Sequence, residues 1–183
     1  MSETTATATN TTASPSLPPP KPFYGKYRGK VIDNSDPLKQ GRIRAQVPAV
    51  FGDDVSGWAL PCSPYGGKGV GFFFIPPIDA NVWIEFENGN PDYPIWTGCF
   101  WGANEAPKIP ALPDVIKMIK TDLTTITIND SQEGGGGGIT IETTAGFKII
   151  IDSMGIELRS NDKVNLKLTT DQVSINNGAL IIE

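Results

Sequence analysis

The sequence predicts an all-β protein, with a small closed barrel in residues 23–102 and a ladder of short strands in residues 121–183. In the ladder, apolar residues recur two apart, which places both members of each pair on one face of a strand. Turn-forming residues separate the pairs, and from Ile149 on the pairs begin every seven to nine residues. In the barrel region, five or six short apolar runs alternate with turns rich in glycine and proline.

The paired residues give the ladder one narrow apolar face. They are Ile126, Ile128, Ile139, Ile141, Ile149, Ile151, Ile156, Leu158, Val164, Leu166, Val173 and Ile175. Burying an Ile or Leu contributes about 1.5–3 kcal/mol, whereas ordering one residue's backbone costs about 1–2 kcal/mol. With about one inward residue in four, an isolated ladder is not stable on this comparison. The sequence therefore predicts an obligate oligomer, an intertwined fibre in which identical chains turn these residues to a common axis.

The barrel region has several runs with a clear inward and outward alternation. The clearest is Arg42–Val47, in which Ile43, Ala45 and Val47 are expected to point inward. Other strands are expected within Tyr24–Asp33, Ser56–Pro61, Phe72–Ile75, Asn81–Glu87 and Pro94–Trp101. Closure into a barrel removes exposed strand edges, and for this reason we expect a small closed barrel.

Two segments flank these regions. Residues 1–22 contain mainly Thr, Ala, Ser and Pro, which predicts a disordered arm, with ordering against a partner as the alternative. Residues 103–120 form a linker, of which Asp114–Lys120 is expected to lead in extended form into the ladder. The N-terminus lacks the pattern of a secretory signal, and no run of about 18 apolar residues occurs. We expect synthesis in the cytoplasm without export by the general pathway.

Composition disfavours several classes of function. The net charge of −5 and the pI of about 4.8 disfavour nucleic acid and anionic membranes as partners. The chain has no histidine, which removes the usual general base and the usual metal ligand. We therefore expect neither an enzyme nor a cofactor or metal site. Cys62 and Cys99 lie in apolar surroundings and are expected to be buried free thiols.

Two groups of barrel residues have a functional and a structural interpretation. Phe72–Phe74, Trp58, Trp83 and Trp96 could stack on single-stranded nucleic acid, but positions in the core or at a subunit interface are favoured. Glu85 and Glu87 could act as an acid and a base, but a solvated outer face is favoured because no other catalytic group is near them in sequence.

A set of barrel motifs resembles the baseplate assembly protein V family. The motifs are Tyr27-Arg28-Gly29-Lys30-Val31, Gly41-Arg42-Ile43-Arg44, Gly57-Trp58-Ala59, Phe72-Phe73-Phe74-Ile75, Val82-Trp83-Ile84-Glu85 and Asn90-Pro91-Asp92-Tyr93. That family forms the central spike of contractile phage tails and of related injection machines, including type VI secretion. The resemblance implies a homotrimer with an oligonucleotide/oligosaccharide-binding (OB) barrel and a triple-stranded, intertwined β-helix. It also implies a non-enzymatic spike that caps the tube, docks on the baseplate hub and punctures the target cell envelope.

The chain departs from this pattern in ways that bear on its partners. The linker has no room for a lysozyme domain, and without histidine there can be no His-x-His iron site. The chain ends on Leu180, Ile181, Ile182 and Glu183 without a tapering tip, so we expect a blunt end on which a separate PAAR-repeat tip protein docks. A tail-associated β-helix that binds or cleaves glycans and a nucleic-acid-binding OB module remain as alternatives. The sequence does not separate a phage tail from an injection particle.

Overall fold

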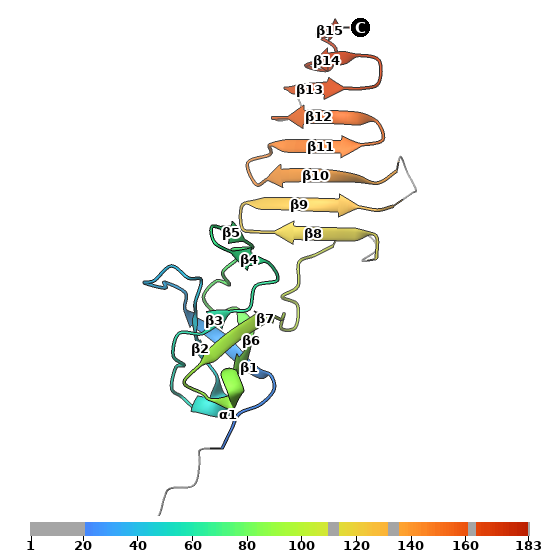
Figure 1. Ribbon diagram of the computed structural model, residues 1–183. Coiled ribbons are helices and arrows are strands. Elements are labelled where there is room, and N and C mark those ends of the chain that lie inside the picture. The colour runs from blue at the N-terminus through green and yellow to red at the C-terminus, as the bar shows by residue number, and fades with distance from the viewer. Residues whose placement is uncertain (1–20, 110–113, 132–135, 161–163, 183) are drawn as a thin grey trace, which may run out of the picture. The chain divides into compact units, whose positions relative to one another are not determined.

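The chain forms two units that are almost entirely β structure. The computed structural model describes residues 21–109, 114–131, 136–160 and 164–182. The chain divides into units spanning residues 1–104 and 105–183 (Figure 1). The described residues include one helix of four residues, α1 (Pro48–Phe51), and one 3-10 helix, η1 (Glu87–Gly89). The all-β prediction is confirmed, whereas most of the predicted N-terminal arm lies outside the described residues.

The first unit contains a five-stranded sheet that closes on itself. Its strands are β1 (Tyr27–Asp33), β2 (Arg44–Gln46), β3 (Leu60–Pro61), β6 (Asn81–Phe86) and β7 (Pro94–Cys99). They lie in the order β2-β1-β6-β7-β3, with β3 parallel to β7 and the other neighbours antiparallel. A bridge between Ile43 and Ala59 joins the two ends of this order. The predicted closed barrel is therefore confirmed.

The barrel core comes from one side of β1, β2, β6 and β7 and from residues directly beside β2 and β3. It contains Val31, Ile43, Ala45, Val47, Ala59, Val82, Ile84, Phe86 and Trp96. Ile43, Ala45 and Val47 are fully buried, as their alternation predicts. The indole N–H of Trp96 donates to the Gly41 carbonyl oxygen at 3.1 Å, so the one polar group of this buried ring has a partner.

The segment around Phe72–Ile75 departs from the prediction. No strand forms there; a hairpin of β4 (Gly66–Gly67) and β5 (Val70–Gly71) precedes it, and the Phe72 N–H donates to the Tyr65 carbonyl oxygen. A run of aromatic residues gives no alternation, and the prolines that follow it cannot donate to a strand ladder.

The two thiols also depart from the prediction. Cys62 and Cys99 are free, but both are exposed rather than buried. Cys62 directly follows β3 and Cys99 ends β7, so both lie where the paired strands stop and less of the barrel covers them. Partial desolvation still raises the pKa of the Cys99 thiol.

The second unit is an eight-stranded antiparallel sheet in which each strand pairs with the next in sequence (Figure 1). The strands are β8 (Ile116–Lys120), β9 (Thr124–Asn129), β10 (Gly138–Thr143), β11 (Lys148–Asp152), β12 (Gly155–Arg159), β13 (Asn165–Leu168), β14 (Val173–Ile175) and β15 (Leu180–Ile182). The predicted ladder of short strands is confirmed. The segment Asp114–Lys120, expected to lead into the ladder in extended form, contains β8, which pairs with β9 as the first strand of the same sheet.

From β9 on, the ladder becomes narrower along the chain. Strands β9 and β10 have six residues, β11 and β12 have five, β13 has four, and β14 and β15 have three. The turn between the last two strands passes through Asn176 and Asn177 at φ of 52° and 57°, a left-handed conformation that Asn tolerates better than most residues. The expectation of an end without a taper is wrong for this sheet, because successive strands shorten from six residues to three.

Candidate assembly face

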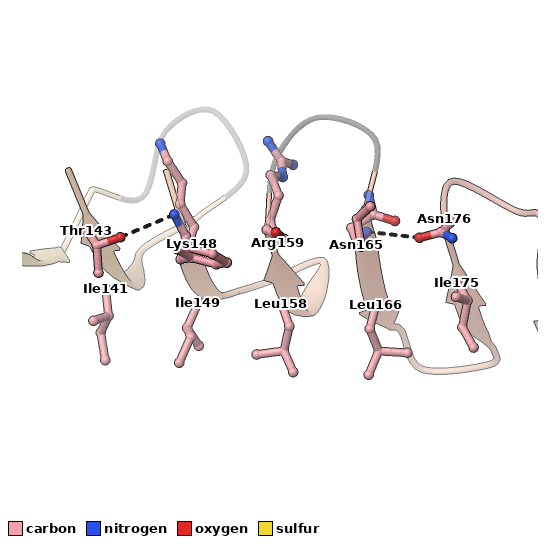
Figure 2. Close-up of a pocket in the computed structure, with 13 residues that line it drawn as sticks. Ile141, Thr143, Lys148, Ile149, Leu158, Arg159, Asn165, Leu166, Ile175 and Asn176 are labelled. Atoms are coloured by element: carbon pink, nitrogen blue, oxygen red, sulfur yellow. Dashed lines mark hydrogen bonds between the residues drawn. The ribbon is translucent and has the colours of Figure 1, made fainter. Parts of the chain in front are cut away.

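Cross-strand pairing arranges the ladder's apolar residues in two rows on one face of the sheet. The first row contains Ile126, Ile141, Ile149, Leu158, Leu166, Ile175 and Leu180. The second row contains Ile128, Ile139, Ile151, Ile156, Leu168, Val173 and Ile182. Figure 2 shows Ile141, Ile149, Leu158, Leu166 and Ile175 side by side on neighbouring strands, pointing to the same side of the sheet.

One residue of the predicted set lies outside both rows. Val164 precedes β13, and its carbonyl oxygen accepts from the Ser160 N–H beyond the paired ends of β12 and β13. Leu168 holds the second-row position on this strand, opposite Ile156 and Val173. The sequence analysis missed Leu168; the signal compatible with it is the same spacing of two, because Leu166 and Leu168 are also two residues apart.

In a single chain nothing covers this face. Ile139, Ile149, Ile151, Ile156 and Leu158 keep 40–44% of their surface exposed. The backbone groups of the paired strands are hydrogen-bonded within the chain, so the uncovered feature is the side-chain surface. A continuous apolar strip of this length is more than a monomeric protein usually exposes, which makes it a candidate assembly face.

A groove of about 620 Å³ runs along the first row. Besides Ile141, Ile149, Leu158, Leu166 and Ile175, it is lined by Thr143, Phe147, Lys148, Arg159, Ser160, Val164, Asn165 and Asn176. These lining residues include no carboxylate, whereas a glycan-cleaving ladder is expected to have a carboxylate-lined groove. The groove is suited to apolar packing.

The opposite face of the ladder carries charged residues of both signs. Glu142 and Lys148 lie directly across from each other and form an ion pair at 2.8 Å. Glu157 accepts from the Arg159 guanidinium at 2.8 Å and from the Asn165 side-chain amide at 3.2 Å. The Glu142–Lys148 pair is exposed, and such pairs contribute about 0–1 kcal/mol each. The Arg159–Glu157 pair is partly buried, because the Glu157 side chain is only 14% exposed.

The acidic candidates in the barrel lie apart from each other. Glu85 forms an ion pair with Lys26 at 2.8 Å on the outer side of β6. Glu87 lies beyond the end of that strand, in η1. The two carboxylates therefore do not share a strand face, and this geometry supports the solvated interpretation over acid/base catalysis.

The three tryptophan candidates lie in three different environments. Trp96 is in the core, whereas the Trp83 and Phe100 rings lie 4.6 Å apart with the Arg28 guanidinium over both. Trp58 lies under the Arg42 guanidinium. Each guanidinium over a ring is a cation–π contact within the chain.

Phe72–Phe74 do not belong to the core. They are 56–69% exposed and border a cavity of about 570 Å³, which is also lined by Trp96, Pro61 and Pro64. The lining residues include no Lys or Arg, although a groove for single-stranded nucleic acid normally carries positive charge. A core position was therefore wrong for these three residues.

Two features are absent from the part of the chain that the structure describes. That part contains no group of three or more His, Cys, Asp or Glu residues that could hold a metal ion. It also contains no helix long and apolar enough to cross a membrane.

Comparison with known families places both units in one kind of assembly. Residues 27–101 match the type VI secretion system/phage-baseplate injector OB domain, and residues 116–181 match the phage baseplate V C-terminal trimerisation domain. An OB barrel followed by a trimerisation ladder defines a structural component of a baseplate or injection apparatus. The chain belongs to the phage baseplate V family. Its trimerisation domain supports a homotrimer.

Curated relatives share a limited part of their length with this chain. The type VI secretion system spike protein VgrG5 of Pseudomonas aeruginosa is 33% identical over 85 residues, which is 46% of this chain and 10% of that protein. VgrG4b of the same organism is 35% identical over 69 residues, 36% of this chain and 8% of that protein. The actin cross-linking toxin VgrG1 of Vibrio cholerae is 32% identical over 112 residues, 59% of this chain and 10% of that protein. The chain thus spans at most about a tenth of each relative.

Proposed function

We propose that this chain is the non-enzymatic central spike of a contractile phage tail or injection apparatus. Three ladders would turn their apolar faces to a common axis, with the barrels at the hub end. The uncovered two-row apolar face carries this proposal. The proposed axis contains Ile126, Ile128, Ile139, Ile141, Ile149, Ile151, Ile156, Leu158, Leu166, Leu168, Val173 and Ile175, with Val164 at its border.

A trimer of such ladders would have the stiffness that puncturing requires. Its strands stack about 4.8 Å apart, so eight strands extend over roughly 35 Å. The hydrogen bonds between strands run along the stacking direction, and three ladders around one apolar core would bend only by breaking many pairs together. The shortening strands would concentrate the force of sheath contraction on a progressively smaller cross-section.

The two ends of the spike would meet different partners. We propose that the barrel docks on the baseplate hub and helps to cap the tube. Leu180, Ile181 and Ile182 are about half exposed in the three-residue edge strand β15, and such an edge could receive a PAAR-repeat tip protein. Glu183, the remaining residue expected at this end, lies outside the described residues.

The proposal includes no catalytic activity for this chain. The separation of Glu85 from Glu87 and the groove without carboxylates support a structural role. The toxin activity in the printed name of the Vibrio cholerae relative belongs to that protein, of which this chain resembles a tenth.

Two measurements test the proposed function. Light scattering on the purified full-length chain should give about three times 19.6 kDa at micromolar concentration. Particles assembled with sheath, tube and hub proteins should puncture target cells when this chain is supplied and should fail to do so without it. A monomeric protein, or particles that puncture equally well without the chain, would overturn the proposal.

A further inference from the structure

The apolar face continues past the first row at one edge of the ladder. Phe147 precedes Ile149 by two residues, and Val164 precedes Leu166 by two, so they extend the same face. The Phe147 carbonyl oxygen accepts from the Thr143 N–H at 3.0 Å, and the Val164 carbonyl oxygen accepts from the Ser160 N–H at 3.0 Å. Thr143, Phe147, Ser160 and Val164 thus form a third column, which we call the edge column.

The large side chains of the edge column are exposed, and they alternate with small side chains along the column. Small hydroxyl residues occupy the ends of β10 and β12, whereas Phe147 and Val164 lie at the starts of β11 and β13. Phe147 is 55% exposed and Val164 is 50% exposed. All four residues line the groove along the first row, so the column is continuous with the trimerisation face.

The other edge of the same face is built differently. At the opposite ends of these strands, Ser153 lies in the turn that follows β11, and Gly137 directly precedes β10. Neither has a bulky side chain. The edge column thus carries the large Phe147 ring at β11, whereas Ser153 and Gly137 are small; Met154, the next residue in that turn, is large and 63% exposed.

Threefold symmetry brings these two edges together. In a cyclic trimer every contact between neighbours is heterologous, so one edge of each chain meets the other edge of the next chain. We propose that the edge column packs against the opposite edge of a second copy of this chain, with Phe147 over Ser153 and Gly137. The inference rests on the trimeric spike proposed above and names the surface that joins neighbours at its corners.

Such a contact would fix how the three chains align along the axis. The two axial rows repeat similar Ile and Leu residues on every strand, so a shift by one strand would bury much the same surface. The single large ring of Phe147 has no equivalent on the adjacent strands, where Thr143 and Ser160 take its place. A shift of one chain by one strand would therefore lose the contact of Phe147, although the two axial rows would bury nearly the same apolar surface.

Cysteine cross-linking in the full-length chain tests this contact. Phe147→Cys and Ser153→Cys would be combined with Cys62→Ser and Cys99→Ser, which remove both native thiols. Within one chain, positions 147 and 153 lie at opposite ends of β11, about 20 Å apart at about 3.4 Å per residue, which is too far for a disulfide. Mild oxidation should convert most of the protein to a covalent trimer on a non-reducing gel, and reductant should reverse it.

A matched pair on the same strand provides the control. Lys148→Cys with Asp152→Cys places thiols one residue inward at both ends of β11, on the opposite face of the sheet, and should give no covalent trimer. Val164→Cys with Thr170→Cys has the same six-residue separation around β13, and it repeats the test if the first pair disturbs folding.

The outcomes separate this inference from the proposed function. A trimeric mass without either edge cross-link would overturn the edge contact while leaving the spike intact. Equal cross-linking of the Lys148→Cys/Asp152→Cys control would also overturn it, because the two faces would then be indistinguishable. A monomeric parent protein would instead contradict the trimeric spike itself.

Discussion

The barrel and the ladder use similar aliphatic residues, but only the barrel encloses them within one chain. In the barrel, Val31, Val82 and Ile84 have no accessible surface, whereas in the ladder Ile149 and Ile151 keep about two fifths of theirs. The difference is closure. The bridge between Ile43 and Ala59 joins the ends of the barrel sheet, so its apolar face meets itself, whereas the ladder is an open strip. The strands of the ladder are fully paired, but strand pairing alone does not give a single chain a hydrophobic core.

This contrast predicts two thermal transitions with different concentration dependence. Unfolding of the barrel should not depend on protein concentration, because its core is complete in one chain. Unfolding of the ladder should shift upward with concentration, because association stabilises it by mass action. Melting curves recorded over a hundredfold concentration range provide the reference for each variant below.

The largest expected effect comes from a charge on the proposed axis. Ile149→Lys would place three ammonium groups around one apolar line, and an unpaired buried charge costs several kcal/mol even after local relaxation. The trimer should be lost, with the barrel transition unchanged. Light scattering and the concentration series would show both effects.

Its control is the next residue in the sequence. Ile150 lies on the opposite face, directly across from Glu157, so Ile150→Lys adds a charge beside a carboxylate at a half-buried position. This variant should keep the trimeric mass. Equal behaviour of the Ile149 and Ile150 variants would mean that the two faces of the ladder do not differ as proposed.

A cavity in the barrel should have the converse effect. Ile84 is fully buried between β1 and β7, and Ile84→Ala should cost about 2–5 kcal/mol of unfolding free energy. The concentration-independent transition should fall, while the ladder transition and the trimeric mass remain. Loss of the trimer in this variant would show that the two regions do not unfold independently.

A backbone change should weaken the ladder without adding a charge. Gly155 begins β12 at φ of 130°, and a Cβ there would collide with the Leu168 carbonyl oxygen of the next strand. Gly155→Ala should cost about 1–3 kcal/mol from the strained backbone conformation alone. The concentration-dependent transition should fall. Gly57→Ala, at a position in the barrel region with nothing within 4 Å of the added Cβ, should leave both transitions in place.

The sequence predicted the ladder well because period two and turn residues are local signals. Strand pairing between sequence neighbours follows from those signals directly, and so do most members of the two apolar rows. Val164 was misplaced because a spacing of two also fits Leu166 and Leu168, and only the pairing opposite Ile156 selects the latter pair. The taper was missed because strand length depends on where pairing stops.

Some features of the barrel could not be predicted from the sequence, because they depend on contacts between residues that are far apart in the chain. The exposure of Phe72–Phe74 and of the two thiols depends on which strand ends the closed sheet leaves uncovered. The hydrogen bond from Trp96 to Gly41 spans 55 residues, and no local pattern in the sequence indicates it.

Acid pH is expected to lower the stability of the barrel but not that of the ladder, because of one carboxylate in the barrel. This effect is expected to be smaller than those of the variants above. Asp36 accepts from the backbone N–H groups of Leu38 and Gln40 and from the Arg42 guanidinium. The hydrogen bond from Arg42 is the main cause that holds the pKa of Asp36 well below its ordinary value of 3.8. The unfolded chain then takes up a proton before the folded chain does. The contribution of this carboxylate is therefore complete above about pH 4 and is lost as the pH falls further.

Asp36→Asn isolates that contribution. At pH 7 the variant should have a lower barrel transition than the parent protein, and the gap should narrow between pH 4 and pH 2.5 as the parent loses its advantage. The ladder transition should show no gap between the two proteins at any pH, since Asp36 belongs to the first unit. Parallel pH profiles for the two barrels would show that the loop around Asp36 does not depend on its charge.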